Sequence, residues 1–302
     1  MIKSTNKILN PLLQIENESI NFKMGFFKAI LVFGLWEIWN TIFSLSISQS
    51  FNKSFLLNNY YIIGILQLLS IPIIIIIFSN TFGKLTWSKN SYNKIKSNNI
   101  LFLALSIIAF RLIYDAYISP IVSLIPLGEV LTNFQNTVKM SPSFLITTFI
   151  TSITYAPIVE EIICRGIVLS GLLKKFSPGL SIFISSLLFA IMHGNIHQGI
   201  NAFLLALFLG YIYYRTKSIF LCIFTHFFNN AFVFLSTVPQ GIISILIKDP
   251  VLLLIVNVFL YTALCIPILI YLYRNFKFHY EENFIPITNK KIYFYNNKIH
   301  SK

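Results

Sequence analysis

Charged residues are scarce in this sequence. Asp, Glu, Lys and Arg make up 11% of its 302 residues, against about 25% in typical globular chains. Such a low charge excludes an intrinsically disordered chain, and 12 Gly and 11 Pro exclude a collagen-like one. The three cysteines, Cys164, Cys222 and Cys265, are odd in number and lie inside apolar runs, so neither a disulfide framework nor a CxxC metal site is expected.

Apolar residues are correspondingly abundant, at 56% with 30 Phe. About 20 consecutive apolar residues span a bilayer as a helix, and in lipid a helix satisfies its own backbone. The sequence therefore predicts an all-α fold, a polytopic membrane bundle of about eight transmembrane helices. The count falls to seven if the fifth and sixth form a re-entrant pair. The eight apolar stretches are 25–48, 59–80, 99–124, 143–173, 179–194, 199–216, 218–238 and 251–273.

The basic residues predict the orientation of these helices. The net charge is +13, and 17 of the 23 Lys and Arg residues fall in segments on one side of the predicted membrane, both termini included. The loops of the other side hold only Lys53, Lys139 and Lys248. By the positive-inside rule, both termini are cytoplasmic and the chain is a multi-pass protein of the cell membrane. Because the charge is spread over loops rather than gathered in a patch, no nucleic-acid partner is expected.

These features divide the chain into five parts. The carboxyl-terminal part mixes aromatic residues with lysines and is expected either to lie at the lipid headgroups or to be a disordered tail. The parts are a cytoplasmic amino-terminal segment (1–24), transmembrane helices without a motif (25–142), a candidate catalytic core (143–238), the last loop and helix (239–273) and a basic cytoplasmic tail (274–302).

Ionisable residues inside the apolar stretches are the first candidates for function, because each costs at least about 2.5–3.5 kcal/mol at the bilayer centre. Four of them are interpreted as structural, including Arg111 and Asp115, which can neutralise each other at i,i+4. The nine are Lys28, Glu37, Arg111, Asp115, Glu160, Glu161, Arg165, His193 and His226.

The fourth stretch contains two adjacent acids. Glu161 and Arg165 are at i,i+4 with the acid first, the favoured orientation for a helical ion pair. Glu160 is turned by about 100° from Glu161 and has no cation on its own helix face. A structural ion pair therefore accounts for Glu161 and Arg165 and leaves Glu160 unexplained.

Two further helices contribute histidines. His193 lies at the end of an apolar run that Gly194 is expected to terminate. His226 and Asn230 share one face of the seventh stretch, whereas Asn229 is assigned to interhelical hydrogen bonding. Counted along the helices from the cytoplasmic side, the candidates reach overlapping depths. They are Glu160, His193, His226 and Asn230.

A carboxylate, two imidazoles and an amide suit hydrolysis without a protein nucleophile. Glu160 could accept a proton from water, His193 could orient that water, and His226 with Asn230 could donate to the oxyanion. Alternatively, Glu160, His193 and His226 could bind a zinc ion that activates the water. No HExxH motif is present, and both alternatives stay open.

Three motifs in this order resemble those of a known family: EExxxR from Glu160, FxxxH ending at His193, and HxxxN from His226 to Asn230. This is the CPBP family of CaaX-protease and bacteriocin-processing (Abi) intramembrane proteases, similar to the glutamate-type CaaX prenyl endopeptidases. The resemblance covers about residues 143–236 and implies a bacterial source.

The resemblance implies that the chain is an intramembrane endopeptidase acting on a membrane-associated peptide or protein in the lipid bilayer. It makes Glu160 the general base, His193 its partner, and His226 with Asn230 the oxyanion hole, with Glu161 and Arg165 supporting the site. It does not decide between zinc and a metal-free glutamate mechanism. A non-enzymatic bacteriocin self-immunity or scaffold protein is the alternative; a proton-coupled transporter is disfavoured because no matching pair of broken helices is seen.

Overall fold

A computed structural model of the chain describes residues 11–12, 14–16, 20–22, 24–52, 55, 59, 61–83, 98–126 and 146–281, with the side chains of 98–99, 237–242, 244 and 275–281 left aside. In this part of the chain all regular structure is helical, as predicted. Lys53, Lys139 and residues 282–302 of the predicted tail lie outside the described residues.

Among the described residues, six helical stretches are long and apolar enough to cross a membrane, which makes this a multi-pass membrane protein; the orientation of the termini stays a prediction. The fifth apolar stretch forms the shorter helix α11 (Pro178–Met192). The six are α2 (Phe26–Ser50), α4 (Tyr61–Phe82), α5 (Asn98–Ile113) with its continuation through η1 (Tyr114–Ile118) and α6 (Ser119–Val122), α12 (Ile196–Thr216), α13 (Ile219–Leu246) and α14 (Pro250–Glu281).

Helix boundaries depart from the prediction at two places. Helix α13 continues to Leu246, eight residues past the predicted end at 238, and α14 continues to Glu281 rather than 273. An apolar run from Ile242 to Ile247 follows the predicted end of α13, so the helix continues until the polar residues Lys248 and Asp249.

The fourth stretch is helical but not a regular α-helix. It passes through two wide, π-helical segments on either side of a short α-helical turn that contains Pro157. Proline has no N–H and removes an i→i−4 hydrogen bond, and π segments are frequent at functional sites. Its elements are η2 (Phe149–Tyr155), α9 (Ala156–Glu161), η3 (Ile162–Leu169) and α10 (Ser170–Leu172).

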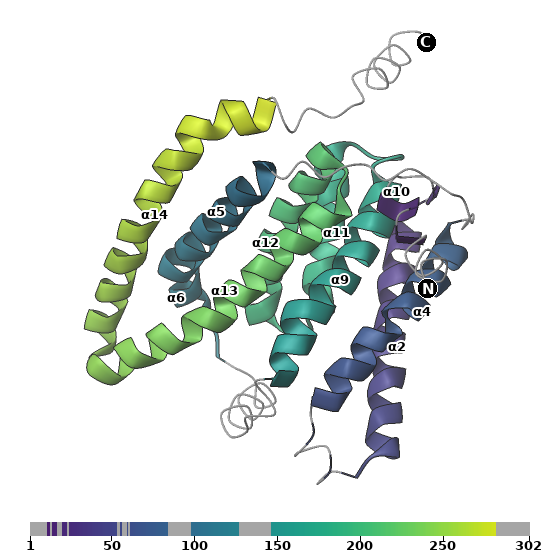
Figure 1. The fold of residues 1–302 in the computed structure, drawn as a ribbon, viewed down its shortest axis with the longest axis horizontal. Helices are drawn as coiled ribbons and strands as arrows, with labels where there is room; N and C mark the ends of the chain where they lie inside the picture. Colours follow the sequence, from purple (N-terminus) through teal and green to yellow (C-terminus); the bar gives the residue numbers. More distant parts are fainter. Residues whose placement is uncertain are drawn as a thin grey trace.

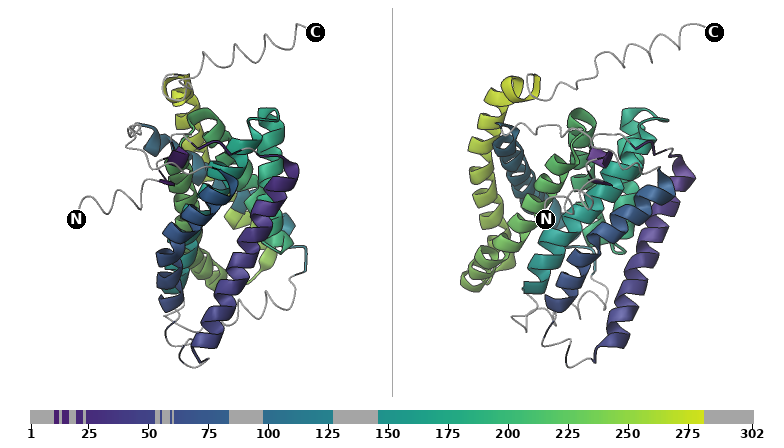
Figure 2. Two further views of the ribbon diagram at one scale, coloured as in Figure 1. Left: turned by 90° about the vertical axis from the view of Figure 1, so that its right-hand side faces the viewer. Right: turned by 45° about the vertical axis from the view of Figure 1, so that its right-hand side comes forward.

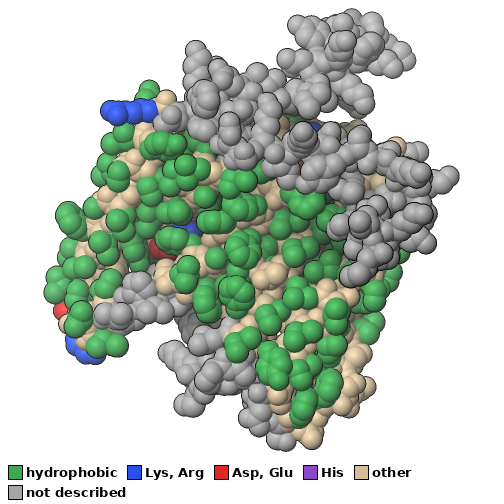
Figure 3. All heavy atoms as spheres, in the orientation of Figure 1, with side chains coloured by type: hydrophobic (Ala, Val, Ile, Leu, Met, Phe, Trp, Pro, Cys, Tyr) green, Lys and Arg blue, Asp and Glu red, His purple; other side chains and the backbone are tan. Residues whose placement is uncertain are grey.

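The helices form a bundle with α2 along one edge and α14 along the opposite edge (Figures 1 and 2). Helices α9, α11 and α12 occupy the middle, where α11 packs against α12. The far end of α13 leaves the bundle to meet the start of α14, which packs against α5. Apolar side chains dominate the face seen in Figure 3, as expected of a lipid-facing surface.

Most of the described residues of the amino-terminal segment are buried within this bundle, and Asn21 is exposed. Ile15, Ile20 and Phe22 are each 1% exposed and belong to the main hydrophobic core. The Glu16 carboxylate accepts hydrogen bonds from the hydroxyl of Ser218 (2.6 Å), which caps α13, and from the N–H of Ile219 (2.5 Å), the first residue of that helix. The segment therefore holds one end of the helix that carries His226.

Candidate active site

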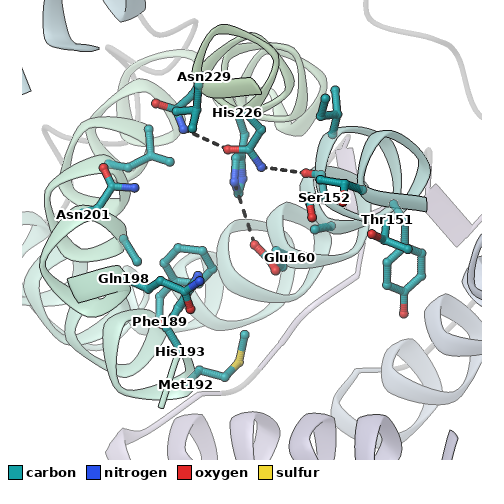
Figure 4. Close-up of a pocket in the computed structure, with 18 of the residues that line it drawn as sticks. Thr151, Ser152, Glu160, Phe189, Met192, His193, Gln198, Asn201, His226 and Asn229 are labelled. Atoms are coloured by element: carbon teal, nitrogen blue, oxygen red, sulfur yellow. Dashed lines mark hydrogen bonds and ion pairs between the residues drawn. The ribbon is translucent and has the colours of Figure 1, made fainter. Parts of the chain in front are cut away.

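A cavity of about 670 Å³ lies inside the bundle, and all four predicted site residues line it. Glu160 comes from α9, His193 from the end of α11, and His226 and Asn230 from α13 (Figure 4). Helices α2, α4 and α12 and the π-helical segment η2 complete its wall. The structure thus brings together residues that are up to 70 positions apart in the sequence.

The ion pair predicted within the fourth stretch is present. Arg165 Nη1 donates to Glu161 Oε1 at 2.8 Å, and both side chains are almost fully buried. Arg165 Nη2 donates to the carbonyl oxygen of Ala206 in α12, at 3.0 Å. The guanidinium also lies over the Phe189 ring, 5.4 Å from its centre. Arg165 therefore neutralises Glu161 and ties α12 and α11 to the fourth stretch.

His226 lies between the two acids. Its Nδ1 is 2.8 Å from Glu161 Oε1, and its Nε2 is 3.9 Å from Glu160 Oε2. Because an ionised carboxylate can only accept, the proton between His226 and Glu161 belongs to Nδ1, and Nε2 is the nitrogen that faces Glu160. The cation that Glu160 lacks on its own helix is thus replaced by an imidazole from another helix.

His193 is held at the end of α11 by its own helix. Its Nδ1 donates to the carbonyl oxygen of Phe189 at 2.9 Å, and the two rings meet edge to face at 4.8 Å between centres. Gly194 follows with φ at +68°, a left-handed conformation that glycine adopts without strain, so the predicted helix end is confirmed. Nε2 of His193 keeps its lone pair, since Nδ1 carries the proton.

Asn230 is fixed by two hydrogen bonds. Its Nδ2 donates to the carbonyl oxygen of Ser152 at 2.7 Å, and its Oδ1 accepts from Asn229 Nδ2 at 2.8 Å (Figure 4). Ser152 belongs to the π-helical segment η2. The assignment of Asn229 to interhelical hydrogen bonding is wrong: its amide bonds to the next residue of its own helix, and it lines the cavity.

Arg111 and Asp115 form the predicted pair, with Arg111 Nη2 2.6 Å from Asp115 Oδ1. Arg111 does more than neutralise this acid, because its Nη1 also donates to Asn201 Oδ1 at 2.7 Å. Asn201 in turn lines the cavity. The interpretation of Arg111 as purely structural is therefore incomplete.

Several further residues on the cavity wall were not among the predicted site residues. Glu37, interpreted as structural, reaches the cavity from α2. Gln198 and Asn201 of α12 carry no charge, and a search restricted to ionisable groups passes over them. A search for neutral amides at helical spacing on one face would have found this pair, which is separated by three positions.

Glu160, His193 and His226 are the residues that could bind zinc. Within the described part of the chain, no group of three or more His, Cys, Asp or Glu side chains is placed to hold a metal ion. Both histidines bond protein groups through Nδ1 and keep Nε2, which is the usual arrangement in zinc ligands, so the misfit comes from the placement of the groups and not from their chemistry. As placed, the donor set does not fit a three-ligand zinc site, so the mechanism proposed below has no metal-dependent step.

Comparisons with known proteins agree with the motifs. Residues 142–232 match the family described as "Type II CAAX prenyl endopeptidase Rce1-like". The resemblance to the CPBP proteases is confirmed. The matched range contains Glu160, His193, His226 and Asn230, whereas α2, α4, α5 and α14 lie outside it.

One curated relative is similar to the chain over part of its length. It is the protein of Bacillus subtilis (strain 168) named "Putative membrane peptidase YdiL", which is 34% identical over 84 residues. The matched stretch covers 28% of this chain and 34% of that relative. No solved structure matches the chain.

Proposed function

We propose that this chain is an intramembrane endopeptidase that hydrolyses a peptide bond of a membrane-associated peptide or protein with a water molecule activated by Glu160. The observation that carries the proposal is the position of His226, with Nδ1 bonded to Glu161 and Nε2 turned to Glu160 at the wall of a cavity. The match to the CPBP proteases and the membrane-spanning helices support it.

The first step is the attack of water on the scissile carbonyl carbon. One proton of the water passes to the Glu160 carboxylate as the water oxygen bonds to the carbon, and the carbonyl electron pair moves onto its oxygen. His193, held rigidly by Phe189, offers Nε2 as an acceptor that orients the other water proton. The proton on Glu160 then passes to the leaving nitrogen as the C–N bond breaks and the C=O bond re-forms, which yields a carboxylic acid and an amine. The proton left on the acid then passes to the amine, so the final products are a carboxylate and an ammonium group.

The oxyanion formed in this step needs donors. Asn230 Nδ2 has two protons, and only one is used by the Ser152 carbonyl, so the second can point at the oxyanion. His226 can donate to the oxyanion when its Nε2 carries a proton, and the contact between Nδ1 and Glu161 holds the ring in place. Glu161 therefore acts through His226 as a positioning residue, and Arg165 acts through Glu161.

The substitution Glu160→Gln tests the role of the base. It keeps the size of the side chain and removes the proton acceptor, and we expect peptide cleavage to fall by roughly 10²–10⁴-fold. Membrane peptides of cells that express the wild type are compared with those of cells that express the variant, and the purified proteins are then compared on the peptides that differ.

Asp249→Asn is the matched control, because it makes the same carboxylate-to-amide change in the exposed turn before α14. It should keep cleavage close to the wild-type rate. Full cleavage by Glu160→Gln would overturn the base assignment. Unchanged membrane peptides, together with protection of cells against a bacteriocin by Glu160→Gln, would instead indicate a non-enzymatic immunity protein.

A further inference from the structure

Two neutral amide side chains, Gln198 and Asn201, stand three residues apart on α12 and line the cavity. Figure 4 shows both on the wall across the cavity from Thr151 and Ser152. In each, the carbonyl oxygen is already occupied: Gln198 Oε1 accepts from Asn195 Nδ2 at 2.7 Å, and Asn201 Oδ1 accepts from Arg111 Nη1 at 2.7 Å. We call these two residues the α12 amide pair.

Arg111 determines which way the Asn201 amide faces. A guanidinium has only donors, so the amide oxygen must point toward it and the NH₂ group away from it. Arg111 is itself 5% exposed and anchored by Asp115, so turning the amide over would break a charge-assisted hydrogen bond inside the bundle. Asn195, which caps the start of α12, orients Gln198 in the same way.

The NH₂ groups of the α12 amide pair are consequently left as donors at the cavity wall. Among the described residues, the structure gives no acceptor to either group. Asn201 is half-buried, whereas Gln198 is exposed. A half-buried donor is normally paired, so a bound molecule would gain most by accepting from Asn201 and would add a further hydrogen bond by accepting from Gln198.

We propose that the α12 amide pair binds backbone carbonyl oxygens of an extended peptide beside the Glu160–His226 pair. The inference rests on the proposed function and adds the substrate-binding wall to it. Residues i and i+3 rise about 4.5 Å along a helix, and carbonyls on one edge of an extended chain repeat at about 6.8 Å. The longer side chain of Gln198 extends the reach of the pair toward this spacing.

The charge of the cavity favours a neutral acceptor. Glu37 and Glu160 both line it, and in their ionised form they would repel a ligand that presents a carboxylate to the same wall. Amide donors have no net charge, and donors that bind backbone carbonyl oxygens do not distinguish one peptide side chain from another. Recognition through them holds an extended backbone in register for cleavage and leaves the choice of sequence to other parts of the wall.

Binding is measured without cleavage, so that the two proposals can fail separately. The probe is a panel of dye-labelled, uncharged apolar peptides of about 20 residues in vesicles of phosphatidylethanolamine and phosphatidylglycerol, and the protein is the full chain carrying Glu160→Gln. Adding Asn201→Asp replaces the donors by acceptors and keeps the contact with Arg111. We expect binding weaker by about 3- to 10-fold or more, the value of one neutral hydrogen bond with repulsion added.

Asn40→Asp is the matched control, because it brings the same new charge into the same cavity from α2. An equal loss of binding in both variants would overturn the proposal, since the added charge alone would explain it. Gln198→Glu is the second test of the pair and should weaken binding in the same direction if Asn201→Asp fails to fold. A panel that binds but is not cleaved by the wild type would contradict the proposed function and leave the amide pair supported.

Thioamide substitution along the probe locates the carbonyl. A thioamide sulfur is a weaker acceptor than a carbonyl oxygen. A thioamide at the peptide position that accepts from Asn201 should therefore weaken binding to the Glu160→Gln protein. The same thioamide should have little further effect once Asn201→Asp is present. Arg111→Gln should reproduce the loss in part, and Arg111→Lys, which keeps a charged donor, should restore binding. Thioamide effects that are the same with and without Asn201→Asp at every position would overturn the assignment.

Discussion

His226 shows how far single residues could be predicted. The sequence places His226 and Asn230 on one helix face, and the structure has both at the cavity. The sequence could not predict that Nδ1 of His226 bonds Glu161, because this contact joins residues 65 positions apart and depends on how two helices pack. Glu161 was therefore expected to pair with Arg165 alone, whereas the same Oε1 atom accepts from both.

The substitution Arg165→Met tests this buried network. Removing the guanidinium leaves the Glu161 carboxylate buried with His226 as its remaining partner, and breaking a buried ion pair from one side costs about 3–5 kcal/mol. We expect a loss of this size in the free energy of unfolding, measured by denaturant titration in detergent micelles. Lys28→Met, at an exposed position in the first turn of α2, is the control and should change stability by less than about 0.5 kcal/mol.

At the scale of elements, helix positions were largely predictable and helix irregularities were not. Runs of apolar residues fix where a helix crosses the membrane, because lipid leaves the backbone no alternative. Because proline has no N–H, Pro157 accounts for a missing hydrogen bond in the fourth stretch. It did not indicate two π-helical segments or that the Ser152 carbonyl would hold Asn230, since these depend on α13.

The close approach of the amino-terminal segment to the catalytic helices gives a second prediction. A Cβ added at Gly171 would lie 2.9 Å from the backbone carbonyl oxygen of Phe22 and closer still to the Met24 side chain. Gly171→Ala should therefore lower the free energy of unfolding by about 1–3 kcal/mol, the usual cost of overpacking. Thermal unfolding in micelles measures the change.

Gly34→Ala is the matched control for this substitution. A Cβ at Gly34 meets nothing within 4 Å, so alanine should be neutral or stabilising by up to about 1 kcal/mol. Equal melting temperatures for the two variants would contradict the packing described for residues 22–24.

Glu16 gives a third prediction, on the start of α13. Its carboxylate accepts from the Ser218 hydroxyl and the Ile219 N–H, where a helix leaves N–H groups without partners and favours negative charge. Glu16→Ala should lower the free energy of unfolding by about 0.5–2 kcal/mol, as for the loss of a helix cap. Glu16→Gln keeps an acceptor and loses the charge, so its free energy of unfolding should lie between those of the wild type and of Glu16→Ala. A Glu16→Gln protein as stable as the wild type would contradict the contribution of charge, and one as unstable as Glu16→Ala would contradict the contribution of the neutral hydrogen bonds.

At the scale of the whole molecule, the sequence predicted the bundle and the core of the site, but not the rest of the cavity wall. Ionisable residues in apolar helices stand out because placing them in the membrane costs free energy, so Glu160 and the histidines could be chosen as candidates from the sequence alone. Neutral amides such as Gln198 and Asn201 cost less free energy in a membrane helix. Their role becomes visible only from the contact of Asn201 with Arg111 and from the position of both residues at the cavity. Such neutral contacts are recognised only once the helices are placed in space.

Among the described residues, the end of the cavity at Gln198 and the basic turn at Lys174 and Lys175 lie at opposite ends of α11. Gln198 follows the turn that joins α11 to α12, whereas Lys175 lies in the turn before α11, at the other end of that helix. If the lysine-rich side is cytoplasmic, as the charge asymmetry predicts, the end of the cavity at Gln198 faces away from the cytoplasm. A substrate would then reach this end from the membrane or from the outer side.

Cysteine labelling tests this orientation. Cys164, Cys222 and Cys265 are free and buried, so a membrane-impermeant maleimide should report mainly on introduced cysteines. In intact cells we expect labelling of Leu124→Cys, at an 80% exposed position after α6, and of Gln198→Cys. Lys175→Cys should be labelled only after the membrane is permeabilised. The reverse pattern would invert the topology and turn the Gln198 end of the cavity toward the cytoplasm, whereas labelling of Gln198 and Lys175 from the same side would contradict the placement of α11 itself.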